Sequence, residues 1–192
     1  MDLKDKKIGF AMCGSFCTFK KAMEAARRLS ELGADIIPIM SETAFSTDTR
    51  FGTAEQFQRE LRDISSKDII ATISGAEPLG PKALLDALVI LPCTGNTLAK
   101  LANGIADSSV TLAAKAHLRN NRPLVIAVST NDGLGAAAQN IGKLLSRKLV
   151  YFVPFGQDDH IHKPNSLVAD FSLLPETTEA ALEGRQLQPV LG

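Results

Sequence analysis

The stretch of sequence that decides the fold is residues 92–107, PCTGNTLAKLANGIAD, which follows the unbroken apolar run ALVIL at positions 87–91. The run predicts a strand with both faces covered, and apolar residues at helical spacing over 97–106 predict a helix after it. Ligands of open parallel α/β sheets bind at this end of a strand. Backbone N–H groups at the helix start can bind an anion there, and Thr94, Asn96 and Thr97 add hydrogen-bond donors and acceptors.

Apolar runs and helical patterns alternate on both sides of this stretch, as in consecutive βαβ units. Strands are predicted at 7–13, 35–40, 69–73, 87–91, 124–128 and 149–153. Helices are predicted at 17–32, 53–63, 97–106, 109–120, 132–147 and 175–183, with a loop at 74–81 and a turn of helix at 82–86. We therefore predict an α/β fold with three layers, a doubly wound, Rossmann-like arrangement with a mainly parallel sheet, in a single domain spanning residues 1–192.

Composition excludes several functional classes. The 192 residues are 45% hydrophobic and 22% charged, with a formal net charge of zero. Acidic and basic residues are interspersed, whereas binding to a nucleic-acid backbone needs clustered Lys and Arg. No apolar run approaches the roughly 20 residues that span a bilayer. The charged N-terminus leads directly into a strand and indicates no signal peptide, so we expect a cytoplasmic protein.

The three cysteines are Cys13, Cys17 and Cys93. An odd number of cysteines without an export signal favours reduced thiols. Cys13 and Cys17 have the spacing of half a metal site, but a structural zinc ion normally needs four ligands. No second cysteine pair is present, and the histidines lie far away in the sequence. We therefore predict no metal site.

The end of the first predicted strand carries Gly14, Ser15 and Thr18. Glycine permits close backbone approach, and the two hydroxyls can donate to a phosphate at a helix start. One glycine is too few for a dinucleotide-binding loop, and no P-loop motif is present. The alternative interpretation is an ordinary strand–helix turn with a capping hydroxyl.

Two further strand ends are also polar. Ser41 and Phe45 follow the second strand, where the alternative is a loop with a core phenylalanine, and Ser129 and Asn131 follow the strand at 124–128. Together with the 92–107 stretch, these ends outline a crevice for a phosphate at one side and a flat polar heterocycle at the other.

The order and spacing of these segments resemble the flavin-containing cysteine decarboxylase superfamily over most of residues 7–156. Its members bind FMN between subunits of a trimer-based homo-oligomer. The resemblance implies a phosphate near Gly14 and Ser15 and an isoalloxazine ring near Asn131. The residues that it implies for FMN binding are Gly14, Ser15, Ser41, Phe45, Thr94, Asn96, Thr97, Ser129 and Asn131.

Two departures argue against cysteine-peptide decarboxylation. The superfamily's decarboxylases carry a catalytic histidine in the loop that corresponds to residues 74–82, where this sequence has none. Their substrate clamp, Pro-x-Met-Asn-x-x-Met-Trp, corresponds to residues 128–135, where only Asn131 survives. A decarboxylase or prenyltransferase of the same superfamily remains the alternative.

A closer resemblance, carried by residues 76–81, 92–97, 129–134 and 164–171, is to flavoprotein subunits of spore-forming bacteria. It implies oxidation of a dihydro- or hydroxytetrahydro- precursor to pyridine-2,6-dicarboxylate in the mother cell during sporulation. It also implies an A subunit that binds NAD(P)H. A non-catalytic, FMN-carrying subunit is a further alternative.

Such an oxidation removes a hydride and a proton, and a flavin can accept the hydride. A dicarboxylate substrate favours cationic groups, and the candidates are Arg50, Lys82 and Lys100. Glu77 is the acid–base candidate, because it lies in the loop where relatives have histidine. We take Glu77 and Lys100 as the catalytic candidates, the alternative being solvated surface side chains. The polar cluster 158–162 is more typical of a mobile loop, and we assign it no role.

Overall fold

A computed structural model describes residues 3–192, so the first two residues of the predicted domain lie outside it. Five parallel strands form the centre of its sheet, in the order β2-β1-β3-β4-β5. These strands are β1 (Lys7–Met12), β2 (Asp35–Met40), β3 (Ala87–Cys93), β4 (Leu124–Thr130) and β5 (Val150–Phe152). The chain order reverses between β1 and β3, which is the topological switch point where sheets of this kind bind ligands. The predicted mainly parallel sheet is confirmed.

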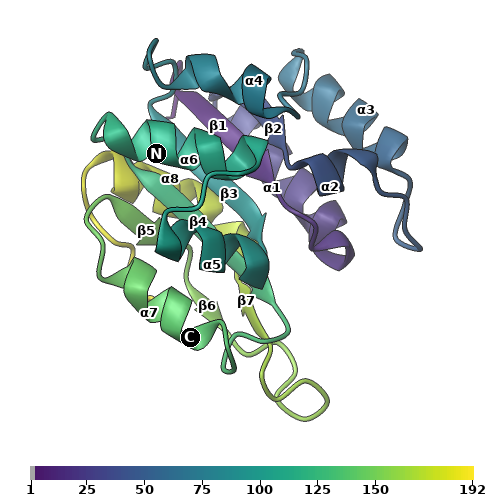
Figure 1. The fold of residues 1–192 in the computed structure, drawn as a ribbon, viewed down its shortest axis with the longest axis vertical. Coiled ribbons are helices and arrows are strands. Elements are labelled where there is room, and N and C mark those ends of the chain that lie inside the picture. The colour runs from purple at the N-terminus through teal and green to yellow at the C-terminus, as the bar shows by residue number, and fades with distance from the viewer. Residues whose placement is uncertain (1–2) are drawn as a thin grey trace.

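Helices cover both faces of the sheet (Figure 1). On one face, α1 (Phe19–Glu31) packs against α8 (Leu174–Leu182) and α3 (Ala54–Ser65). The other face carries α4 (Ile73–Ala76), α5 (Gly95–Asn103), α6 (Ser109–Arg119) and α7 (Ala138–Leu145). A short helix, α2 (Glu42–Ser46), follows β2. The predicted three layers are therefore present. No helix formed by residues 3–192 is long and apolar enough to cross a membrane.

Local sequence explains where the helices begin. The side chain of Thr53 accepts from the Gln56 N–H at 3.2 Å, at the first turn of α3. Ser108 and Thr111 form a reciprocal capping box at the start of α6. Such caps satisfy N–H groups that a helix leaves without an internal partner. Strand β3 is buried along its whole length, as its continuous apolar sequence predicts.

Two short strands, β6 (Phe155–Gly156) and β7 (Leu167–Ala169), were not predicted. They pair antiparallel to each other, and β7 pairs with Ser129 and Thr130 at the end of β4. Between them, residues 157–166 form a projection that we call the lobe. Strands of two or three residues carry no readable periodicity, so only the tertiary pairing reveals them.

The segment before β3 differs from its prediction. In place of a strand at 69–73, only Ile70 forms an isolated bridge, to Ile39 of β2. The predicted loop at 74–81 contains α4, which Thr72 caps, and a 3₁₀-helical turn (Glu77–Leu79). The helical turn predicted at 82–86 is absent: residues 80–83 form a hydrogen-bonded turn, in which Ala83 has a left-handed backbone with φ 45°.

The helix predicted at 132–147 begins only at Ala138. Residues 131–137 form hydrogen-bonded turns instead, since Gly133 and Gly135 weaken helix formation. Gly133 also lies against β7: a Cβ atom there would be 2.5 Å from Leu167 Cγ. Glycine at this position thus lets the turn lie close to β7.

Candidate functional site: two joined clefts

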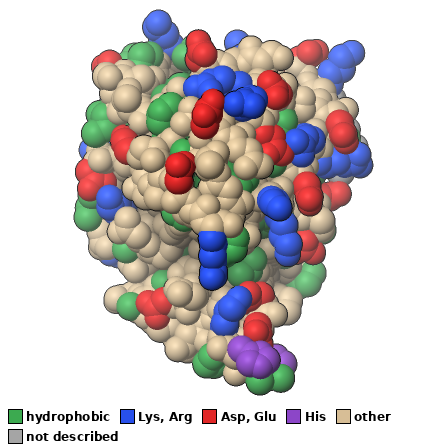
Figure 2. All heavy atoms as spheres, turned by 90° about the vertical axis from the view of Figure 1, so that its right-hand side faces the viewer, with side chains coloured by type: hydrophobic (Ala, Val, Ile, Leu, Met, Phe, Trp, Pro, Cys, Tyr) green, Lys and Arg blue, Asp and Glu red, His purple; other side chains and the backbone are tan. Residues whose placement is uncertain are grey.

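A cleft of about 1020 Å³ lies at the carboxyl ends of β1, β3 and β4, and we call it the first cleft. Its walls come from residues 14–18, from the turn that carries Arg50 and Phe51, from residues 94–96 and 129–132, from α7 and from the lobe. Figure 2 shows the surface hollowed above the lobe, whose tip carries two exposed histidines. Lys and Arg side chains lie on both sides of this hollow.

A second cleft, of about 630 Å³, adjoins the first. The two share Gly14, Thr94 and Asn96, so they meet at the ends of β1 and β3. The rest of the wall of the second cleft comes from Cys13, from residues 41–43 at the start of α2, from Ile73, from Thr97 and Lys100 on α5 and from residues 107–108 before α6. One extended ligand can therefore contact both clefts across Asn96.

Hydroxyl groups join the ends of β1 and β4 in the first cleft. Ser15 Oγ lies 2.8 Å from Ser129 Oγ, and Thr18 Oγ1 lies 3.4 Å from the same Ser129 atom. Thr18 also donates to the Ser15 carbonyl at 2.8 Å. Ser129 is only 3% exposed. These residues are 111 to 114 positions apart in the sequence, and the parallel sheet brings them together.

The start of α5 lies between these strand ends. Thr94 caps it by accepting from the Thr97 N–H at 3.2 Å. Within residues 3–192, the backbone N–H groups of Gly95 and Asn96 have no acceptor. A Cβ at Gly95 would lie 2.8 Å from Thr130 Oγ1, so a larger residue would crowd this helix start. Two free N–H groups at the positive end of a helix are suited to an anion.

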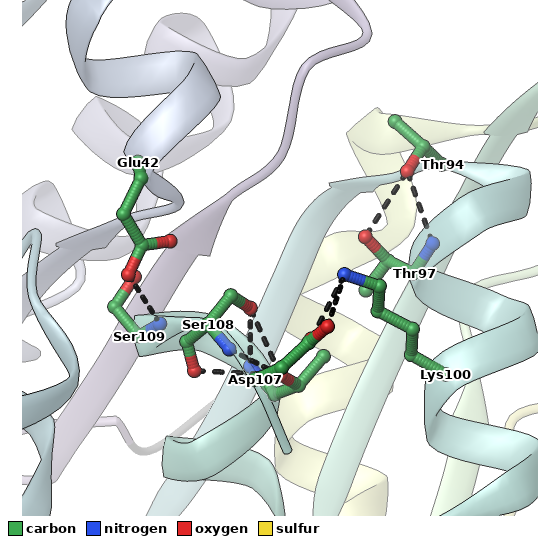
Figure 3. A network of polar contacts seen from close by, with 8 residues as sticks. Glu42, Thr94, Thr97, Lys100, Asp107, Ser108 and Ser109 are labelled. Atoms are coloured by element: carbon green, nitrogen blue, oxygen red, sulfur yellow. Dashed lines mark hydrogen bonds and ion pairs between the residues drawn. The ribbon is translucent and has the colours of Figure 1, made fainter. Parts of the chain in front are cut away.

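Polar groups in the second cleft bind mainly to one another (Figure 3). Glu42 Oε1 accepts from the Ser109 N–H at 3.0 Å, at the start of α6. Lys100 Nζ lies 2.8 Å from Asp107 Oδ1, and this hydrogen-bonded contact lowers the pKa of Asp107. Ser109 Oγ donates to the Met40 carbonyl at 2.6 Å. These contacts fix α2, α5 and α6 relative to β2.

The cysteines have different surroundings. Burial raises the pKa of the Cys13 thiol to about 11, despite a hydrogen bond with Thr97 that lowers it. Burial also raises the pKa of Cys93 well above its usual range. Cys17 is exposed and lines the first cleft. Nowhere in residues 3–192 do three or more His, Cys, Asp and Glu side chains form a group that could hold a metal ion.

Most of the residues predicted to bind a cofactor meet at the two clefts. Those that line at least one cleft are Gly14, Ser15, Ser41, Thr94, Asn96, Thr97, Ser129 and Asn131. Phe45 lines neither and packs against the hydrophobic core, as the alternative interpretation expects.

The charged candidates are more dispersed. Lys100 lines the second cleft, and Arg50 lines the first. Glu77 and Lys82 are exposed and line neither cleft, because the 3₁₀-helical turn that begins at Glu77 packs against α6. Asp158 lines the first cleft, whereas the lobe's histidines do not.

Sequence reasoning missed Phe51, Lys163 and Ser166, which line the first cleft. Lys163 and Ser166 belong to the lobe, whose position depends on the pairing of β7 with β4. No local pattern indicates that pairing. For Phe51, the only signal in the sequence was its position directly after the candidate Arg50.

Comparisons with known proteins agree with this architecture. A family model described as "Flavoprotein" matches residues 1–169. The B subunit of dipicolinate synthase from Bacillus subtilis is 48% identical over 189 residues, which cover 98% of this chain and 94% of that protein. The crystal structure of the corresponding B subunit from Bacillus halodurans C has a TM-score of 0.92 and 46% identity, and the match covers 100% of this chain and 98% of that one. The FMN-dependent cysteine decarboxylase SpaF, at 23% identity and TM-score 0.69 over 95% of this chain and 98% of that one, shares the fold.

Proposed function

This chain belongs to the flavoprotein family, and from that premise we propose that it is the B subunit of a dipicolinate synthase. Its similarity to two such subunits extends over nearly the whole chain, in sequence and in structure. In this proposal the protein contributes to the oxidation of a dihydro- or hydroxytetrahydrodipicolinate to pyridine-2,6-dicarboxylate. It acts as a homo-oligomer with an A subunit that binds NAD(P)H, in the mother cell of a sporulating bacterium.

FMN is the proposed cofactor, and the donor set of the joined clefts fits it. The observation that carries the proposal is the free pair of N–H groups at Gly95 and Asn96, in the cleft that the hydroxyl group of Ser15 also lines. Such a set is suited to a phosphate. The amide side chains of Asn96 and Asn131 can both donate to and accept from a polar heterocycle.

When bound, the flavin supplies a hydride acceptor. The chain's own residues hold and orient the reactants. Lys100, paired with Asp107, keeps a cation at the second cleft. Glu77 stays a proposed acid–base group, and its place outside both clefts means that it would act from a neighbouring copy of the chain.

The visible spectrum of the purified protein tests the cofactor, and reconstitution tests the reaction. We expect a yellow protein that forms pyridine-2,6-dicarboxylate when it is mixed with an NAD(P)H-binding partner and the precursor. A colourless protein that gains no flavin band with added FMN would contradict the proposal.

A non-catalytic subunit that carries FMN for its partner is the second candidate. It is favoured by one observation: within residues 3–192, no histidine lines either cleft, and Glu77 lies outside both. The variant Glu77→Gln combined with Lys100→Met separates the two functions. Unchanged synthesis by the reconstituted complex, with flavin still bound, would favour the non-catalytic role.

A further inference from the structure

The turn at residues 47–53, between α2 and α3, is built to hold one position. Thr49 and Gly52 exchange backbone hydrogen bonds of 3.1 and 3.2 Å, and the Phe51 N–H donates to Thr49 Oγ1 at 3.2 Å. Gly52 has φ +149°, and a Cβ atom there would lie 2.7 Å from the buried ring of Phe57. The turn is thus packed against the core through a residue that only glycine fits.

The end of the turn is also fixed. Asp48 Oδ1 accepts from the Ala54 N–H, the first residue of α3, at 2.8 Å. The turn is therefore tied to a helix of twelve residues that packs against α1 and β2. The backbone at Arg50, midway between these anchors, is set by its neighbours rather than by its own side chain.

Arg50 and Phe51 both line the first cleft. The Arg50 guanidinium carbon lies 4.8 Å from the centre of the Phe51 ring, in a cation–π contact. No carboxylate within residues 3–192 forms an ion pair with Arg50. The guanidinium is held in place over the ring, and its N–H groups are free of acidic partners.

The other charged groups of the first cleft are already engaged. Lys163 Nζ lies 3.4 Å from Asp158 Oδ2, and the hydrogen bond with Ser166 is the main cause that lowers the pKa of Asp158. The carboxylate of Asp132 lies against the backbone of Gly135 in the turn at residues 131–137, where Oδ1 would be 2.0 Å from an added Cβ. Arg50 is therefore the cation that the cleft can offer to a ligand.

We propose that Arg50 binds one carboxylate of a planar dicarboxylate in the first cleft. A guanidinium can hold a carboxylate with two parallel hydrogen bonds. Stacking on Phe51 already restricts the orientation of the guanidinium, so binding costs less conformational entropy. This inference rests on the proposed function for the identity of the dicarboxylate. Arg50 is in this view a substrate-binding residue that selects for negative charge.

Binding of pyridine-2,6-dicarboxylate to the FMN-loaded protein, measured by calorimetry, tests the proposal. We expect Arg50→Gln to weaken binding at least about tenfold, because it removes a charged hydrogen-bond partner of the carboxylate. Arg50→Lys restores only part of it, because a point charge lacks the planar fork. Arg59→Gln is the matched control, since Arg59 pairs with Glu55 on α3, outside the first cleft.

The flavin band and the thermal midpoint check that each variant is folded and loaded. Equal affinity of Arg50→Gln and the unaltered protein would overturn the inference, even if the reconstituted complex makes the product. So would a loaded protein that does not bind the dicarboxylate. Weaker binding by the Arg50 variants but not by Arg59→Gln supports the inference even if reconstitution yields no product, an outcome that counts against the proposed function alone.

Discussion

The two clefts share three residues but use their polar groups differently. In the second cleft, Glu42 and Lys100 are bonded to other parts of the chain, and the buried Ser109 next to its wall donates to the Met40 carbonyl; these contacts hold helices in place. In the first cleft, the N–H groups at the start of α5 and the guanidinium of Arg50 have no such partners within residues 3–192. The comparison separates groups that stabilise the fold from groups that are available to a ligand. Substitutions of groups that are bonded within the chain should therefore affect mainly stability, and substitutions of groups that are free should affect mainly binding.

The largest expected effect concerns the far end of α6, the helix that begins beside the second cleft. His117 on α6 bonds through Nε2 to the Pro123 carbonyl at 2.9 Å, and burial lowers its pKa to about 4 from 6.5. The folded protein thus favours the neutral ring. This contribution to stability is fully present only above about pH 6.5, where the ring is neutral in the unfolded chain as well. As the pH falls to 4, we expect about 3 kcal/mol of the free energy of unfolding to be lost.

Chemical denaturation between pH 7 and 4 measures this loss. His117→Gln keeps an N–H donor but does not titrate, so its stability should depend less on pH over that range. If the stability of both proteins depends on pH in the same way, His117 is not the group that causes the loss.

Ser109→Ala is the next largest change. Ser109 is fully buried, and its loss leaves the Met40 carbonyl without a 2.6 Å donor. We expect the free energy of unfolding to fall by about 1–2 kcal/mol. The affinity for FMN, measured by fluorescence titration, should stay within about twofold, because this hydroxyl is already committed. A large loss of FMN affinity would show that Ser109 contributes to the ligand site as well as to the fold.

Ser129→Ala is the matched change in the first cleft, at a serine that is also buried. Among residues 3–192, its hydroxyl forms hydrogen bonds only with the hydroxyl groups of Ser15 and Thr18. We expect FMN affinity to fall about fivefold to tenfold and stability to change by less than about 1 kcal/mol. The same titration and denaturation assays apply. A variant that loses stability but keeps FMN affinity would reverse the roles of the two clefts.

The smallest structural effect is expected from modifying Cys17. It is exposed in the first cleft, whereas Cys13 and Cys93 are buried with raised pKa values. Only a thiolate reacts quickly with a disulfide reagent. We expect one of the three thiols to react in the native protein and all three after denaturation. Added FMN should slow the native reaction; an unchanged rate would place the cofactor away from this wall.

The sequence predicted the parallel core well because buried parallel strands are continuously apolar. The strand at 35–40 was predicted at its observed bounds, and most residues predicted for the cofactor line the clefts. The strand predicted at 124–128 continues to Thr130, since its polar last residues pair with β7. That extension depends on a partner 37 to 39 positions away, which hydrophobic periodicity does not register.

The roles of individual polar residues were harder to predict. A sequence displays Glu42 and Arg50 alike as charged residues after a strand. Only the fold shows that Glu42 is bonded to the start of α6 while Arg50 has no acidic partner within residues 3–192. Glu77 was chosen for its place in the sequence, and the packing of its turn against α6 keeps it outside both clefts of its own chain.

The attachment of the lobe has an evolutionary consequence. Because β7 joins only the last two residues of β4, the lobe is added to the parallel sheet without interrupting it. Changes in the length or charge of residues 157–166 leave the register of β1, β3 and β4 intact. We therefore expect related chains to differ more in the lobe than at the ends of the central strands.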